Sequence, residues 1–344
     1  MKRLYTLTLF SIGIAACIFF FKKRNPTTIS SGDGLVISSA WLQVNKNPIT
    51  PAADLRPADQ TFLTFPEWFL VFSPEEQANY FKQRTSTSFP FMSHTAQIWE
   101  SYHIVNDQIK DHFPTNTGYH FMIWVIGTSA SAEYSIKAWY ETVIGRITDT
   151  EIPVTDEDKF NAQYTQDYVD FIKDRPWYEF DFKSRLTGLW SSTSFFGPDF
   201  LRKIERKYIL TSELLVKYVY AKLIGLGTEQ VYDVALPTTV VVLDNDSTVS
   251  LPRYDKFANA ATEIAMSGYS FKEIAGNNSA ILLTVLVPSE TNETFENTVV
   301  VFTQPCASDP ATKRITLATP VTNLSSLLRQ LESKNRKPEH VFDY

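Results

Sequence analysis

The sequence predicts an α+β protein: a mainly helical domain with an internal repeat, then a small antiparallel α+β domain of the ferredoxin-like type. Three observations predict this class. An uncharged run occupies the N-terminus, helical periodicity dominates from about residue 73 to 227, and short strand-like runs follow. We expect a transmembrane anchor, an extended arm, a helical domain and an α+β domain at residues 1–24, 25–66, 67–229 and 230–344.

The composition is that of a folded chain without affinity for polyanions. Of the 344 residues, 44% are hydrophobic, and they include 25 Phe, 16 Tyr and 7 Trp, which argues against disorder. The formal charge of -6 gives no attraction to nucleic acid, so we expect no nucleic-acid partner. The two cysteines, Cys17 and Cys306, predict no disulfide framework.

Residues 4–21 form an uncharged apolar run between Lys2-Arg3 and Lys22-Lys23-Arg24. The run has about the minimum length that spans a bilayer, so we expect an uncleaved signal anchor with the bilayer as its partner. A lipoprotein signal is the competing interpretation, since residues 14–17 resemble a lipobox. The apolar run continues past Cys17, which favours the anchor. Basic residues nearly balance across the run; the usual orientation of a signal anchor places the body on the periplasmic side of a bacterial inner membrane.

Residues 25–34 read as a flexible stem, and the proline-spaced residues 45–66 as an extended arm lying on the next domain. Ser73-Pro74-Glu75-Glu76 predicts a helix start, with Ser at the N-cap, Pro at the first helical position and Glu at the third. Further helices are expected at about 94–110, 119–144, 156–173, 182–192 and 198–226.

The helical region contains a repeat. The stretch Glu133–Asp149 recurs eighty positions later as Glu213–Glu229, with a helical stripe of shared residues. Gly145 and Gly225 are predicted to end the two helices as left-handed C-caps. The identical pairs are Glu133/Glu213, Lys137/Lys217, Tyr140/Tyr220, Ile144/Ile224, Gly145/Gly225 and Thr148/Thr228.

A second set of matches extends the repeat towards the N-terminus. Residues 89–101 share two Phe, two Ser and one Trp with residues 180–192, at an offset of ninety-one. The two offsets differ by eleven, which predicts an eleven-residue insertion in the first copy. Each copy would be a helical hairpin unable to bury its own apolar face, and pairing the copies would bury both.

Two apolar segments, residues 121–132 and 209–226, are candidates for further membrane contact. The first is too short to span a bilayer and the second is interrupted by Glu213, Lys217 and Lys222, so we favour buried helices. Partial insertion of both helices into the bilayer remains the alternative.

After Thr228 the periodicity changes to that of strands. We expect strands at 231–243, 280–287, 298–303, 314–318 and 340–344, and helices at 252–275 and 324–334. This order predicts one antiparallel sheet with two helices on one face.

Glu133, Lys137, Glu213 and Lys217 are the first candidate site residues. Glu followed by Lys four positions later is the favourable polarity for a helical ion pair. Paired across the two copies, these charges would set the alignment of the duplicated helices, which we favour over a cleft that binds a polar ligand.

Glu100 and His103 have the Glu-x-x-His spacing that di-iron helix bundles use, and Glu133 and Glu213 could complete such a site. No second Glu-x-x-His exists in the chain, so we favour ordinary surface positions and name no cofactor. An enzyme with a metal or carboxylate site among these residues is the runner-up function.

Asp244 and Asp246 follow an apolar run as the paired acids of haloacid-dehalogenase-type phosphatases do. Those enzymes also need a Lys and further acids on a later strand, for which the chain has few candidates. A strand that ends in a turn rich in Asp, Asn and Ser accounts for the same residues.

Four segments resemble a group of bacterial membrane-anchored proteins without an assigned activity: TFPEWFLVFSPEE (64–76), GYHFMIWVIGTSASAEYSIKAWYETVIGR (118–146), YVDFIKDRPWYEFDF (168–182) and GPDFLRKIERKY (197–208). The resemblance implies a bacterial cell envelope and no catalytic residues. We therefore expect a single-pass anchored protein that binds or scaffolds at the membrane, with a protein as a further partner, and we do not favour an enzyme.

Overall fold

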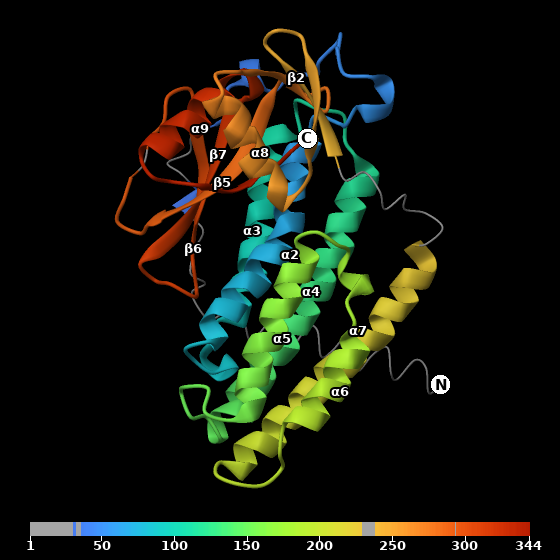
Figure 1. Ribbon diagram of the computed structural model, residues 1–344, viewed down its shortest axis with the longest axis vertical. Helices are drawn as coiled ribbons and strands as arrows, with labels where there is room; N and C mark the ends of the chain where they lie inside the picture. Colours follow the sequence, from blue (N-terminus) through green and yellow to red (C-terminus); the bar gives the residue numbers. More distant parts are fainter. Residues whose placement is uncertain (1–29, 32–35, 229–237, 293) are drawn as a thin grey trace.

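The computed structural model describes residues 30–31, 36–228, 238–292 and 294–344, and in these the chain is α+β, with a helical part followed by strands (Figure 1). The predicted anchor at residues 4–21 lies outside the described residues. Within the described ranges no helix combines the length and the apolar character needed to cross a bilayer. The helices are α2 (Gln60–Phe81), α3 (Phe91–Ile109), α4 (Thr117–Val143), α5 (Asp156–Ile172), α6 (Phe182–Ser192), α7 (Phe200–Thr228), α8 (Asp255–Met266) and α9 (Leu324–Ser333).

The helix α2 corrects the prediction of a helix start at Ser73. It begins at Gln60 and contains both Pro66 and Pro74, so the expected arm ends earlier than residue 66. Most of its side chains are buried, including five Phe, and this packing outweighs the loss of two backbone donors. The other five predicted helices of this region are present within a few residues of their expected bounds.

The internal repeat appears as two three-helix units, α2–α3–α4 and α5–α6–α7. Across the α2–α5 contact, Lys82 donates to Gln166 at 2.8 Å, and Lys173 donates to Glu75 at 2.7 Å. At the offset of ninety-one, Lys82 matches Lys173 and Glu75 matches Gln166. The two bonds therefore join the same pair of matching positions in opposite directions. The units are therefore related by an approximate two-fold axis.

The predicted insertion has a definite location. Helix α3 has 19 residues, whereas its counterpart α6 has 11. Helix α7 begins at Phe200, which matches His120 at the offset of eighty, whereas α4 begins earlier, at Thr117. The additional residues of the first copy therefore lie in α3 and at the start of α4. Despite this, Trp99 Nε1 donates to Ser131 Oγ at 2.9 Å, and the matching Trp190 Nε1 donates to Thr211 Oγ1 at 3.1 Å. The extra turns therefore leave the equivalent contacts in place.

The predicted left-handed glycine caps are wrong. Neither Gly145 nor Gly225 is among the glycines with positive φ in the described residues. Gly145 starts a 3-10 helix, Gly145–Ile147, directly after α4, whereas Gly225 lies inside α7. The two glycines match in the sequence but lie in different backbone structures.

The strands form two antiparallel sheets, which corrects the predicted single sheet. The larger has the order β1-β6-β7-β5-β8 and the smaller the order β3-β2-β4. The predicted helix at 252–275 is in fact α8 followed by a strand, and the strand that pairs with β2 in a hairpin was not predicted. The strands are β1 (Ser30–Ser31), β2 (Thr238–Leu243), β3 (Thr248–Pro252), β4 (Phe271–Ile274), β5 (Ala280–Pro288), β6 (Val299–Pro305), β7 (Thr312–Pro320) and β8 (Pro338–Val341).

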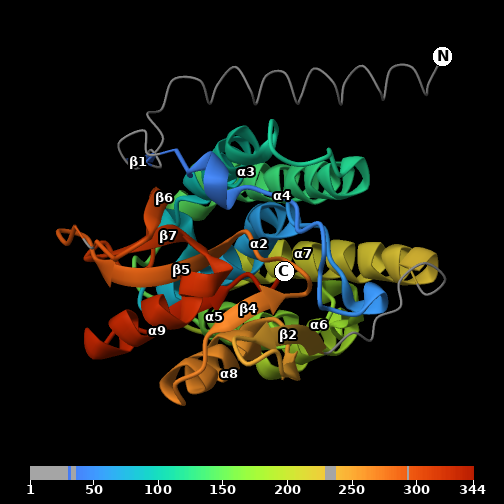
Figure 2. The ribbon, with the colours of Figure 1, turned by 90° about the horizontal axis from the view of Figure 1, so that it is seen from above.

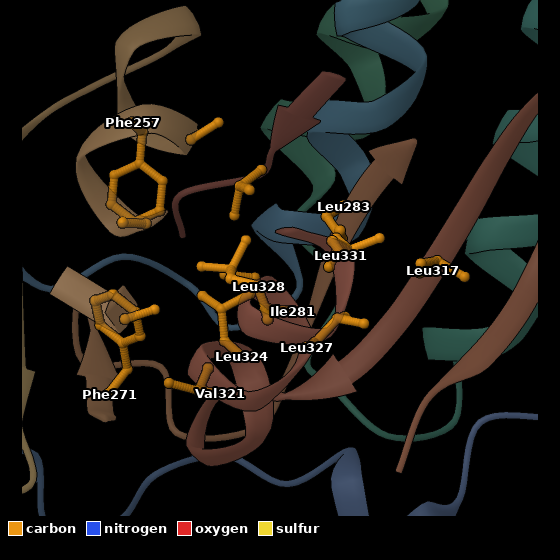
Figure 3. Close-up of a cluster of buried hydrophobic side chains, with 14 of the residues drawn as sticks. Phe257, Phe271, Ile281, Leu283, Leu317, Val321, Leu324, Leu327, Leu328 and Leu331 are labelled. Atoms are coloured by element: carbon orange, nitrogen blue, oxygen red, sulfur yellow. The ribbon is translucent and has the colours of Figure 1, made fainter. Parts of the chain in front are cut away.

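Helices α8 and α9 enclose one core together with the strands. Figure 3 shows Phe257 of α8 and Leu324, Leu327, Leu328 and Leu331 of α9 beside side chains of the strands, and all five are at most 1% exposed. The strong apolar stripe of α9 explains its position, because one face of that helix has to be covered.

A second core joins the helical part to the larger sheet. Phe65 of α2 meets Phe302 of β6 edge-on, with ring centroids 4.8 Å apart. The arm before α2 lies on the smaller sheet, where the backbone amides of Ile49 and Thr50 donate to the Glu273 carboxylate. The two parts expected on either side of residue 229 thus share buried surface.

Candidate functional site

The four charged residues of the repeat meet at the seam between α4 and α7. Lys137 Nζ lies 2.9 Å from Oε1 of both Glu133 and Glu213. Lys217 Nζ lies 3.0 Å from the same two oxygens. Each lysine therefore contacts both glutamates, and we refer to this group as the quartet.

The quartet is recessed and electrically neutral. The side-chain exposure is 34% for Glu133, 15% for Lys137, 10% for Glu213 and 18% for Lys217. Burial by itself would raise the pKa of Glu133, but Lys217 and Lys137 lower it to about 2. Burial would lower the pKa of Lys217, but the glutamates outweigh burial and raise it well above its usual value. The two lysines also lower the pKa of Glu213, so Glu133, Glu213 and Lys217 are held in their charged forms at neutral pH.

Beside the quartet, α4 and α7 expose apolar side chains along their length. The helices approach each other at the quartet and diverge along the rest of their length (Figures 1 and 2), and the Tyr140 and Tyr208 rings stack at 6.4 Å. The inner sides of α4 and α7 contact α2 and α5, so the exposed stripes point away from them. The exposed residues at matching repeat positions are Phe121/Leu201, Trp124/Ile204, Ile136/Val216, Trp139/Val219 and Val143/Leu223. We name these ten residues the α4–α7 face.

A polar chain leads inward from the residue next to Glu133. The Tyr134 hydroxyl and the Ser73 hydroxyl lie 2.7 Å apart, and Ser73 Oγ lies 2.8 Å from His94 Nδ1. His94 Nε2 lies 3.5 Å from Glu76, whose other oxygen accepts from Arg314 of β7. Burial lowers the pKa of His94, so the imidazole is neutral.

Ser73, His94 and Glu76 contact one another in the sequence serine, histidine, carboxylate, as in a hydrolase triad. The three side chains nevertheless lie in the protein core. The exposed fractions are 0%, 0% and 3%, and phenylalanine rings pack on the imidazole. A nucleophile has to reach a substrate, and this hydroxyl is enclosed. The network instead connects α2, α3 and α4 with β7.

A second charged cluster was missed by sequence reasoning. Arg206 of α7 donates to both carboxylate oxygens of Glu141 at 2.6 and 2.9 Å, and Arg202 donates to Asp158 at 2.8 Å. Both arginines are at most 2% exposed. Burial would lower the pKa of Arg206, but Glu205 and Glu141 raise it above its usual value. The signal in the sequence was a pair of arginines four positions apart, which places them on one side of the helix.

The other candidate residues lie on different elements from the quartet. Glu100 and His103 project from α3, where the His103 ring lies beside Tyr102. Across the described residues, no group of three or more His, Cys, Asp or Glu side chains is arranged to hold a metal ion.

Asp244 and Asp246 lie in the turn of the β2–β3 hairpin. Asp246 has a φ of 63° and is exposed, and its carboxylate pairs with Lys272. The phosphatase motif needs a strand that leads into an open catalytic edge, whereas this strand turns back on itself. The turn interpretation accounts for both acids.

No family model, no curated protein and no solved structure matches this chain.

Proposed function

We propose that this chain is a membrane-anchored binding protein of the bacterial cell envelope. Residues 4–21 would hold it in the bilayer, and the α4–α7 face would contact its partner. The observation that carries the proposal is the pairing of exposed apolar residues at matching positions of two helices that a charged quartet joins.

An exposed apolar surface of this extent is costly in water unless something covers it. Single exposed apolar residues are ordinary, but contiguous patches mark interaction sites. The face contains two tryptophans, Trp124 and Trp139, each 56% exposed. Aromatic side chains with such exposure are typical of contact surfaces.

Binding also fits the chemistry of the described residues better than catalysis does. The Ser73–His94–Glu76 network is enclosed, and the quartet charges neutralise one another. Neither group presents a free nucleophile or base to solvent.

The anchor is tested by alkaline carbonate extraction of membranes that contain the full chain. We expect the full chain to stay in the pellet and a Phe10→Arg/Ile14→Arg variant to be released, because two arginines in the run oppose its insertion. Equal retention of both proteins would overturn the anchor.

The face is tested by a benzophenone amino acid placed at Trp139 or Val216 of the full chain, irradiated in cells. We expect adducts at both positions and none at Met266, which is 57% exposed on α8 and outside the face. Absence of adducts at Trp139 and Val216 would contradict the proposal.

A further inference from the structure

We infer that the partner of the α4–α7 face is the lipid bilayer itself, with α4 and α7 lying along the membrane surface and their exposed side chains among the acyl chains. This rests on the proposed anchor, which brings the body to the membrane, and names what the face contacts there.

The length and composition of the face suit lipid. From Phe121 to Val143 the stripe on α4 is roughly 33 Å long at 1.5 Å per residue, and α7 carries a second stripe at the matching positions. The ten residues of the face are all aliphatic or aromatic. Helices that lie in the interface bury such a side at the boundary of headgroups and acyl chains.

An exposed basic side chain stands near the end of each stripe. Arg146 is exposed three positions after Val143, in the 3-10 helix that follows α4. Lys222 is exposed one position before Leu223, near the end of α7. From such positions a long basic side chain reaches the headgroup region while its stem stays against apolar surface.

Charged side chains can lie between the two apolar stripes because they pair with one another in the quartet. An isolated charge there would strongly oppose contact with acyl chains. Here each lysine lies within 3.0 Å of two carboxylate oxygens and each glutamate contacts two lysines. The group is neutral and recessed, so the cost of moving it away from water is reduced by contacts that already exist.

The position of the tether favours lipid over other occupants. Ser30–Ser31 pair with β6, β6 contacts α3, and α3 packs on α4 through Trp99. Residues 22–29 separate this point from the apolar run and reach at most about 30 Å. The anchor therefore holds the α3–α4 side of the body near the membrane.

Charged pairs stand on the elements beside α4 and α7. Asp107 of α3 and Lys110, the residue that follows the helix, are exposed and paired with each other, and Asp167 of α5 pairs with Arg185 of α6. These charged pairs oppose contact of α3 and α5 with acyl chains, which favours an orientation with α4 and α7 towards the bilayer.

The test uses the full chain with Cys17→Ser, reconstituted into phosphatidylcholine vesicles, with a spin label on a cysteine at Ile136 or Val216. Met266→Cys is the matched control, because Met266 is an exposed apolar residue on α8. The unlabelled Cys306 is 6% exposed, and the Cys17→Ser parent measures its background. Collision rates with oxygen, which partitions into acyl chains, are compared with those of a water-soluble nickel chelate.

We expect labels at Ile136 and Val216 to collide mainly with oxygen and the label at Met266 mainly with nickel. Mainly nickel collisions at Ile136 and Val216 would overturn the inference, since the face would then lie in water. Protection from both reagents would also overturn it, since a protein, such as a second copy, would then cover the face. A label at Phe10→Cys reports on the anchor separately, so its failure is distinguishable from failure of the face.

Discussion

Lys217 of α7 contacts Glu133 of α4 at 3.0 Å, and this contact is the two-fold counterpart of the 2.9 Å contact between Lys137 and Glu213. The approximate axis that relates the two halves of the helical body passes between these pairs. Matching positions of the sequence therefore make matching contacts, and the same four residues join the helices that carry the α4–α7 face.

Replacing either lysine of the quartet with methionine tests that role. We expect Lys137→Met and Lys217→Met each to lower the free energy of unfolding by about 1–2 kcal/mol, because two carboxylates would share one cation. The two losses should be similar, since the positions are equivalent. Urea titrations monitored by circular dichroism measure them.

Lys110→Met is the control for the quartet, because Lys110 and Asp107 form an ion pair with both side chains more than half exposed. We expect no measurable change there. Unchanged urea midpoints for both quartet variants would reject the aligning role.

The quartet also predicts a pH dependence. The lysines hold the pKa of Glu133 at about 2 against an ordinary 4.5, so the folded protein binds this proton more weakly than the unfolded chain. The contribution of Glu133 to stability is then complete above pH 4.5 and is lost as the pH falls towards 2. We expect the difference in unfolding free energy between the wild type and Glu133→Gln to be constant from about pH 7 to 5 and to shrink below about pH 4.5. A difference that stays constant down to about pH 2.5 would refute this.

The two repeat glycines should respond oppositely to alanine. A Cβ atom at Gly145 would overlap Oε2 of Glu141, which Arg206 holds in place. We expect Gly145→Ala to destabilise by about 1–3 kcal/mol. At Gly225 the nearest such atom, on Tyr178, lies 4.0 Å away, and the residue is inside α7, so Gly225→Ala should be neutral or stabilise by up to about 1 kcal/mol. Equal effects in thermal unfolding would contradict the described packing.

The buried arginine cluster should be more sensitive than the quartet. Arg206→Met leaves Glu141 without its bidentate partner in a buried position, and we expect a loss of about 3–5 kcal/mol. Arg185→Met removes a partly exposed pair with Asp167 and should cost less than about 1 kcal/mol. Chemical denaturation measures the free energy of unfolding of both variants. Similar losses would show that the pair between Arg206 and Glu141 contributes no more to stability than the partly exposed pair.

Periodicity and repeat matching predicted much of the helical part. The stripe through Glu133, Lys137 and Tyr140 placed one side of α4 against α7, and the difference between the two offsets located the longer α3. Helical periodicity is a local property, and the repeat is found by comparing two segments of the same sequence. Both can therefore be predicted without knowledge of the tertiary structure.

Features that depend on tertiary packing were not predictable in this way. The two prolines of α2 read as helix boundaries, but the surrounding phenylalanines keep the helix continuous. Arg202 and Arg206 gain their role only when Asp158 and Glu141 are placed beside them. The division of the strands into two sheets depends on pairings between distant segments, such as β5 with β8.

The most direct measurement is the quenching of tryptophan fluorescence by brominated acyl chains, with the full protein in vesicles. Residues 4–21 contain no tryptophan, so quenching reports on the body alone. The account predicts strong quenching in the wild type and a marked decrease in Trp124→Phe/Trp139→Phe, while Trp68→Phe, which removes a tryptophan of α2 that is only 8% exposed, leaves it nearly unchanged. Little quenching in the wild type, or the same quenching after Trp124 and Trp139 are replaced, would contradict contact of the α4–α7 face with lipid.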